Sequence, residues 1–234
     1  MNLLILALAP VFIIGGYIYF RDKYEREPIR MLLLALLFGA LTVIPISFLE
    51  YFLSGFAGLF SGLGAAAWKA FVVAAFSEEL FKYIALYLLI WKSREFNDKL
   101  DGIVYAVFIS LGFAGVENVM YVMGNGYGTG LMRAVTAVPA HAVFGITMGF
   151  YFGLAKFYVK QQHRLKLKAL LYPIILHGIY DFILFTGIGW LAILFLGFLI
   201  FLYYSGFKRV RELRKQSIYN TDWNLMNNKF SKPN

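Results

Sequence analysis

The sequence predicts an all-α, polytopic membrane protein with about seven transmembrane helices. Of its 234 residues, 60% are hydrophobic and only 15% are charged, whereas soluble domains have about 45–50% apolar and about 25% charged residues. Apolar runs of about eighteen residues or more recur along the chain, and each is long enough to cross the hydrocarbon of a bilayer as a helix. We therefore expect one multi-pass domain surrounded by lipid, with short connections and no soluble domain.

The apolar runs set the expected helices and domains. The first run is interpreted as a retained helix and not as a signal peptide, because no Lys or Arg precedes Arg21. We expect a transmembrane helical domain over residues 1–207 and a basic, polar cytoplasmic tail over 208–234. The expected spans are residues 3–20, 31–54, 67–91, 102–123, 134–158, 169–186 and 190–207.

Lys and Arg alternate between the connections of these spans. They are plentiful in 21–30, 92–101, 159–168 and the tail, and scarce in 55–66, 124–133 and 187–189. By the positive-inside rule, the N-terminus lies outside and the C-terminus lies in the cytoplasm. The net charge of +9 is explained by this pattern, so no nucleic-acid partner is expected. The Gly-rich stretch 124–130 is expected to be a flexible outer connector.

Two adjacent carboxylates and an ammonium interrupt the third apolar run. They belong to Glu78, Glu79 and Lys82, and each ionised group near the bilayer centre costs about 2.5–3.5 kcal/mol on insertion scales. Charged groups inside a membrane usually mark a functional site that faces the bundle interior. Glu78 and Lys82 are four residues apart, so they share a helix face and can pair.

Other polar side chains occupy three further spans at a similar depth. At about 1.5 Å per residue from the outer helix ends, they fall in one layer in the outer half of the bilayer. The residues of this layer are Glu117 with the adjacent Asn118, His141, and the i,i+4 pair His177 and Asp181. A carboxylate at that spacing can fix the tautomer of the imidazole. Glu50, near the outer end of its span, is expected to reach the lipid headgroups.

Such a layer supports two classes of function. In a hydrolase, a carboxylate takes a proton from water while imidazoles orient the water or stabilise the oxyanion, or Glu and His bind a metal that acidifies the water. In a proton- or cation-coupled transporter, the same groups relay protons or bind cations. The chain has no cysteine, which excludes a cysteine nucleophile and thiolate metal sites. A retinal receptor is excluded because the last span has no Lys.

Four short motifs, each on its own span, resemble those of the PrsW family of intramembrane proteases. Residues Glu78-Glu79-Leu80-Phe81-Lys82 resemble its Glu-Glu-x-x-Lys motif, and Phe113-Ala-Gly-Val-Glu117 resembles its Phe-x-x-x-Glu motif. The surroundings of His141 and the run from His177 to Asp181 resemble the other two, and the resemblance extends over nearly the whole chain. The related type II CAAX prenyl proteases and bacteriocin-processing proteins usually have Glu-Glu-x-x-x-Arg, so this chain departs from them at Lys82.

The resemblance implies a protease of the bacterial cell membrane that makes the site-1 cut in the extracytoplasmic part of a single-span anti-sigma factor. It implies that Glu78 or Glu79 is the general base and that Lys82, Asn118 and Asp181 support the site. The residues that would hold the water are Glu117, His141 and His177. No obligatory metal is expected. The alternative is Zn²⁺, for which the expected ligands are Glu79, Glu117, His141 and His177.

Overall fold

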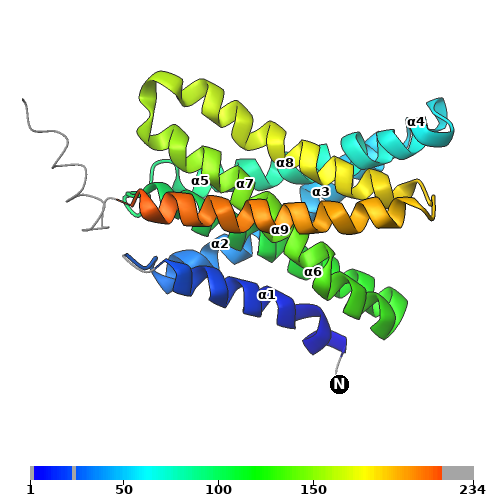
Figure 1. Cartoon of the computed structure of the whole chain (residues 1–234), viewed down its shortest axis with the longest axis horizontal. Coiled ribbons are helices and arrows are strands. Elements are labelled where there is room, and N and C mark those ends of the chain that lie inside the picture. The colour runs from blue at the N-terminus through cyan, green and yellow to red at the C-terminus, as the bar shows by residue number, and fades with distance from the viewer. Residues whose placement is uncertain (1–2, 23–24, 218–234) are drawn as a thin grey trace, which may run out of the picture.

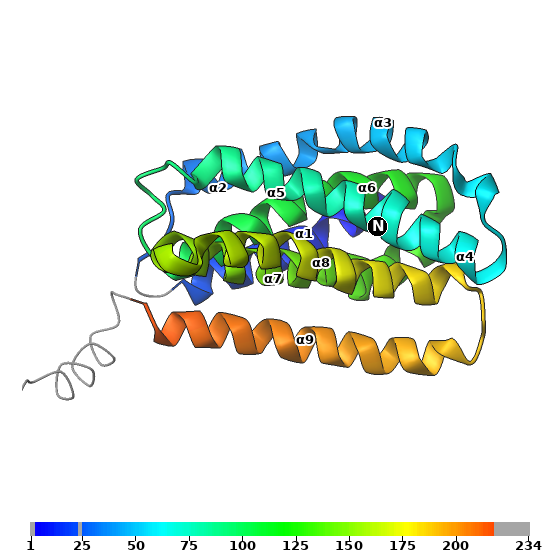
Figure 2. The ribbon, with the colours of Figure 1, turned by 90° about the horizontal axis from the view of Figure 1, so that it is seen from above.

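A computed structural model describes residues 3–22 and 25–217 of the chain. This part is a bundle of roughly parallel and antiparallel helices (Figures 1 and 2), with no strand among the described residues. Five stretches are helical, long and apolar enough to cross a membrane: 3–21, 29–59, 99–157, 159–185 and 191–215. The all-α membrane fold is therefore confirmed. Seven crossings and the orientation of the termini stay predictions.

Helices cover all seven predicted spans, and two of the spans are subdivided. The second span is divided at Thr42, and the third consists of a short α-helix, a π-helix and a longer α-helix. In chain order the elements are α1 (Leu3–Arg21), α2 (Ile29–Leu41), α3 (Val43–Ser54), η1 (Ala57–Leu59), α4 (Gly62–Ala67), the π-helix η2 (Trp68–Phe76), α5 (Ser77–Ile90), α6 (Lys99–Val135), α7 (Ala137–Phe157), η3 (Val159–Gln161), α8 (Gln162–Phe185) and α9 (Leu191–Lys215).

The end of helix α9 can be compared with the predicted start of the cytoplasmic tail at residue 208. The helix continues eight residues past the predicted end of the last span and stops at Lys215. Residues 218–234, and Lys23 of the basic connection 21–30, lie outside the described residues. The division of the chain at residue 208 therefore stays a prediction.

Helix α6 is the centre of the bundle. Every side chain from Leu100 to Gly115 is buried, and α6 packs against α1, α2 and α7. The contact with α7 requires glycine, because a Cβ atom at Gly149 would lie 2.2 Å from the carbonyl oxygen of Gly102, and one at Gly153 would lie 2.1 Å from that of Lys99. Small residues at this spacing let two membrane helices approach closely.

The outer helices present their apolar side chains outwards. Tyr51 on α3 is 85% exposed and Ile193 on α9 is 77% exposed, and α3 and α9 lie at opposite edges of the bundle (Figure 2). Meanwhile Glu79 and Lys82 are fully buried. This arrangement, with apolar groups outside and ionisable groups inside, is the one expected of a protein dissolved in lipid.

The stretch 124–130, predicted to be a flexible connector, is helical on both sides of a turn and is counted as part of α6. Its one non-helical residue is Gly126, with a φ of 78° and a ψ of −164°, a conformation open to glycine but not to other residues. The chain turns back there, so a Cβ atom at Gly130 would approach Val122 to 3.2 Å and Leu6 to 2.5 Å. The turn returns Arg133 to the level of Glu117.

A second group of acidic side chains lies where α1 and α9 end and α2 and α6 begin. We call this group the acid cluster; it consists of Asp22, Glu25, Glu27, Asp98 and Asp101. The Asp101 carboxylate accepts the backbone N–H of Asp98 at 2.6 Å, and Asp98 accepts that of Lys99 at 2.5 Å, which caps the first turn of α6. The Tyr105 hydroxyl donates to Glu27, and the Ser217 hydroxyl donates to Asp98.

Candidate active site

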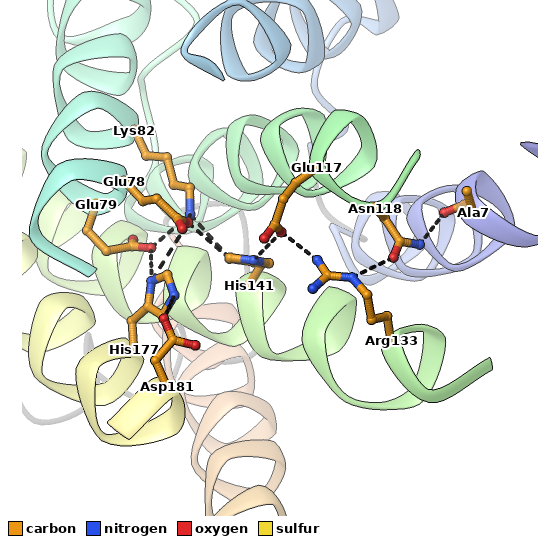
Figure 3. Close-up of polar contacts among 10 residues, drawn as sticks. All are labelled: Ala7, Glu78, Glu79, Lys82, Glu117, Asn118, Arg133, His141, His177 and Asp181. Carbon is orange, nitrogen blue, oxygen red and sulfur yellow. Dashed lines mark hydrogen bonds and ion pairs between the residues drawn. The ribbon is translucent and has the colours of Figure 1, made fainter. Parts of the chain in front are cut away.

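The predicted polar residues of four helices meet inside the bundle (Figure 3). Glu78, Glu79 and Lys82 project from the first turns of α5, and the others come from α6, α7 and α8. The residues that the structure brings together are Glu78, Glu79, Lys82, Glu117, Asn118, His141, His177 and Asp181. We call this group the site cluster. The catalytic roles expected of its members stay predictions.

Lys82 joins the two glutamates to His141. Its Nζ lies 2.9 Å from Glu78 Oε2, 2.9 Å from Glu79 Oε1 and 3.2 Å from His141 Nδ1, and 4.1 Å from the centre of the Phe113 ring. An ammonium has three donors and no acceptor, so His141 Nδ1 must accept. His141 therefore carries its proton on Nε2, which donates to Glu117 Oε2 at 3.0 Å. The lysine thus sets the tautomer of the histidine.

His177 is held between two carboxylates. Its Nδ1 lies 3.1 Å from Glu79 Oε1 and its Nε2 lies 3.3 Å from Asp181 Oδ2, so the predicted i,i+4 pair forms. The imidazole also stacks on Phe144, with ring centres 4.8 Å apart. These three contacts fix the plane of the ring, as expected of a histidine that must hold one orientation.

Arg133 contacts the site cluster, although its place in the 124–133 connection does not predict such a role. Its Nη2 donates to Glu117 Oε2 at 2.6 Å and its Nε donates to Asn118 Oδ1 at 2.9 Å. Its guanidinium also lies 4.0 Å from the centre of the Tyr121 ring. Asn118 in turn donates to the carbonyl of Ala7 on α1 at 2.8 Å. The available signal was that Arg133 is the only basic residue in the 124–133 stretch.

The site cluster opens into a cavity of about 710 Å³. Its walls come from α3, η2, α5, α6, α7, α8 and α9, and its polar lining includes Glu78, Glu117, His141, His177 and Asp181. Glu79 and Lys82 do not line it because they are completely buried behind Glu78. Glu50, which we expected to reach the headgroups, lies on the cavity wall.

Four donor groups of the site cluster could hold a metal ion. One donor atom from each of Glu78, Glu79, His141 and His177 lies within 4.8 Å of the others; the expected set had Glu117 in place of Glu78. Carboxylates and imidazoles are suitable zinc ligands, and Glu79 Oε2 is buried with no hydrogen-bond partner among the described residues. The donor set therefore fits a divalent cation, but Lys82 contacts three of the four residues and would have to move away.

These features define a class of protein. A helical membrane bundle that buries two glutamates and two histidines beside a cavity of this size has the groups that a membrane-embedded hydrolase needs. The comparisons with known proteins agree with this class.

The chain belongs to the PrsW family. The family described as "PrsW family intramembrane metalloprotease" matches residues 27–205. Its relatives include the Protease PrsW of Geobacillus kaustophilus, 37% identical over 91% of this chain and 92% of the relative. Those of Bacillus subtilis and Clostridioides difficile are 34% and 38% identical, over 88% and 87% of this chain and 93% and 87% of the relatives. No solved structure matches the chain.

Family membership confirms the resemblance that the four motifs suggested. The protein is a membrane-embedded peptide hydrolase and a multi-pass protein of a bacterial membrane. The transporter alternative has no support from these relatives, all of which are named as proteases.

Proposed function

We propose that this protease makes the site-1 cut in the extracytoplasmic part of a single-span anti-sigma factor. The position of the cavity supports this substrate. Residues on its wall, such as Glu50, Asn125 and Phe185, lie next to the three connections that are poor in Lys and Arg. By the positive-inside rule these connections face the outside. The cut would then fall on the extracytoplasmic side.

We propose Glu78 as the general base, and the difference between the two glutamates carries this assignment. Glu78 lines the cavity, whereas Glu79 is fully buried and binds Lys82 and His177. A base must reach the water whose proton it takes. The water oxygen bonds to the peptide carbonyl carbon, its proton passes to Glu78, and the proton is then delivered to the nitrogen that leaves as the amine.

The remaining members of the site cluster position the reacting groups. His141 and His177 line the cavity beside Glu78 and are proposed to hold the water and the oxygen that becomes negative in the tetrahedral intermediate. Glu117 fixes His141, and Asp181 fixes His177. Lys82 keeps a positive charge between Glu78 and Glu79, which stabilises both as carboxylates.

We propose that no metal is obligatory, because Lys82 already supplies positive charge to the atoms that a metal would bind. The family description names a metalloprotease, so Zn²⁺ is the alternative. Glu78, Glu79, His141 and His177 would hold it, and when bound it would acidify a coordinated water.

The test uses purified protein in detergent with single-span anti-sigma factors as substrates. Glu78→Gln should lower the cleavage rate by about 10²–10⁴-fold, the usual contribution of a general base, while Glu95→Gln, outside the site, should cleave like the unmodified protein. Thermal unfolding of each variant checks its folding. Full activity of folded Glu78→Gln would refute the assignment. Loss of activity with a chelator, restored by Zn²⁺, would refute the metal-independent mechanism.

A further inference from the structure

Helix α3 presents one regular face to the cavity. Val43, Ile46, Ser47 and Glu50 line the wall, and their spacing of i, i+3, i+4 and i+7 places them on a single helical stripe. Glu50 is the only ionisable residue of that stripe. It faces the same space as Glu78, Glu117 and the two histidines.

Glu50 differs from the other carboxylates of the cavity in having no partner. Glu78 pairs with Lys82 at 2.9 Å, Glu117 with Arg133 at 2.6 Å, and Asp181 with His177 at 3.3 Å. Within residues 3–22 and 25–217, no hydrogen bond or ion pair to Glu50 is formed. On the cavity wall it shares the space with the carboxylates of Glu78 and Glu117, which carry the same sign of charge.

An unpaired carboxylate in a membrane-spanning helix is costly, and it usually indicates a functional group whose partner can be identified by its charge. Among the described residues no Lys, Arg or His forms an ion pair with Glu50, while the rest of the α3 stripe is apolar or a hydroxyl already bound to the Val43 carbonyl. We therefore look for its partner in the molecule that enters the cavity. A cationic side chain would neutralise Glu50 and offset the repulsion from Glu78 and Glu117.

We propose that Glu50 is a specificity-determining residue that binds a Lys or Arg side chain of the substrate close to the scissile bond. This inference rests on the proposed function, because it requires a polypeptide substrate that enters the cavity. It adds a requirement that the site cluster alone does not impose: the cleaved segment carries a positive charge near the cut.

The experiment uses a set of purified single-span reporter proteins that differ only in the extracytoplasmic segment next to the span. Each position of that segment is changed in turn to Lys, Gln or Glu, and the cut is mapped by mass spectrometry. One position should prefer Lys over Gln by about tenfold in kcat/KM, as expected for a hydrogen-bonded charged pair. The preference should appear in KM and leave kcat nearly unchanged.

Variants of Glu50 then assign the preference. Glu50→Gln, which keeps the shape of the side chain, should remove it; Glu50→Lys should reverse it in favour of Glu; and Glu50→Asp should retain part of it. Ser47→Ala, on the same face of α3, is the matched control and should preserve the preference for Lys.

The outcomes separate this inference from the proposed function. Cleavage with no charge preference at any position, or a preference that Glu50→Gln retains, overturns the inference and leaves the protease mechanism intact. If the folded, unmodified protein cleaves none of the reporters, the single-span substrate is wrong, and the inference fails with it.

Discussion

The site cluster and the acid cluster both bury several carboxylates, but they stabilise these carboxylates in different ways. In the site cluster, carboxylates face cations: Glu78 and Glu79 share Lys82, and Glu117 binds Arg133. In the acid cluster, the carboxylates accept from a phenol, a hydroxyl and backbone N–H groups. The first arrangement preserves negative charge inside the bundle, and the second favours its removal.

The pKa values of two residues in the acid cluster reflect this difference. Burial raises the pKa of Asp22 from 3.8 to about 7 and that of Glu27 from 4.5 to about 7. Both residues lie in the connection between α1 and α2, outside the membrane-spanning helices. Neighbouring carboxylates reinforce the shift, because like charges disfavour ionisation.

The largest expected effect comes from removing the cation of the site cluster. Lys82→Met leaves two buried carboxylates without their partner, so the free energy of unfolding should fall by about 3–5 kcal/mol and cleavage should be lost. Denaturant or detergent titration measures the stability. Tyr105→Phe in the acid cluster is the comparison: it should cost about 1–3 kcal/mol and retain cleavage. Equal stability losses in the two variants would contradict the distinction between the clusters.

A smaller effect is expected from Arg133, which positions Glu117 through the contact between its Nη2 and the Glu117 carboxylate. Arg133→Ala should lower kcat by about 10–100-fold with little change in KM, because a displaced Glu117 no longer fixes His141. Arg133→Lys should recover only part of the rate, since an ammonium cannot reproduce the two directed contacts to Glu117 and Asn118. If Arg133→Ala changes KM alone, the residue acts in substrate binding instead.

The smallest effect is a pH dependence of stability caused by the acid cluster. The folded pKa values of Asp22 and Glu27 lie above the unfolded ones, so the folded state retains protons that the unfolded state releases. Stability should therefore fall as the pH rises from about 4 to about 7 and should level off above that range. The double variant Asp22→Asn, Glu27→Gln should flatten this part of the curve of unfolding midpoint against pH. An unchanged slope would refute the protonated state of the cluster.

Much of the site could be predicted because charges stand out in apolar sequence. Glu78, Lys82 and His177 each interrupt a long apolar run, where a charged or polar side chain usually indicates function. The i,i+4 spacing correctly predicted the contacts of Glu78 with Lys82 and of His177 with Asp181. The helices could be predicted equally well, because the length and hydropathy of an apolar run determine whether it spans a membrane. Three of the four clustered donor residues were expected, namely Glu79, His141 and His177, but choosing Glu78 over Glu117 requires knowing the rotation of α5.

The roles of Arg133, Glu50 and the acid cluster were missed because they depend on contacts between residues far apart in the sequence. Arg133 follows a glycine-rich stretch that resembles a connector, and only the left-handed conformation of Gly126 turns it back towards Glu117. Glu50 lies near a helix end, where headgroup contact is the ordinary expectation. The acid cluster could not be predicted for a similar reason. Asp22 and Asp98 lie in connections between spans, where charged residues are common and burial is not expected.

The π-helix η2 leads directly into α5 and therefore sets the direction in which Glu78 and Glu79 point. Its Trp68 is anchored by a hydrogen bond to the Leu53 carbonyl at 3.0 Å, and nine residues later the chain enters α5 at Ser77. An α-helix turns its side chains by about 100° per residue, and the wider π-helix turns them by less. Glu78 and Glu79 therefore point in directions that the same number of α-helical residues would not give them, so the side chains of η2 should be exchangeable as long as the π-helix itself is retained.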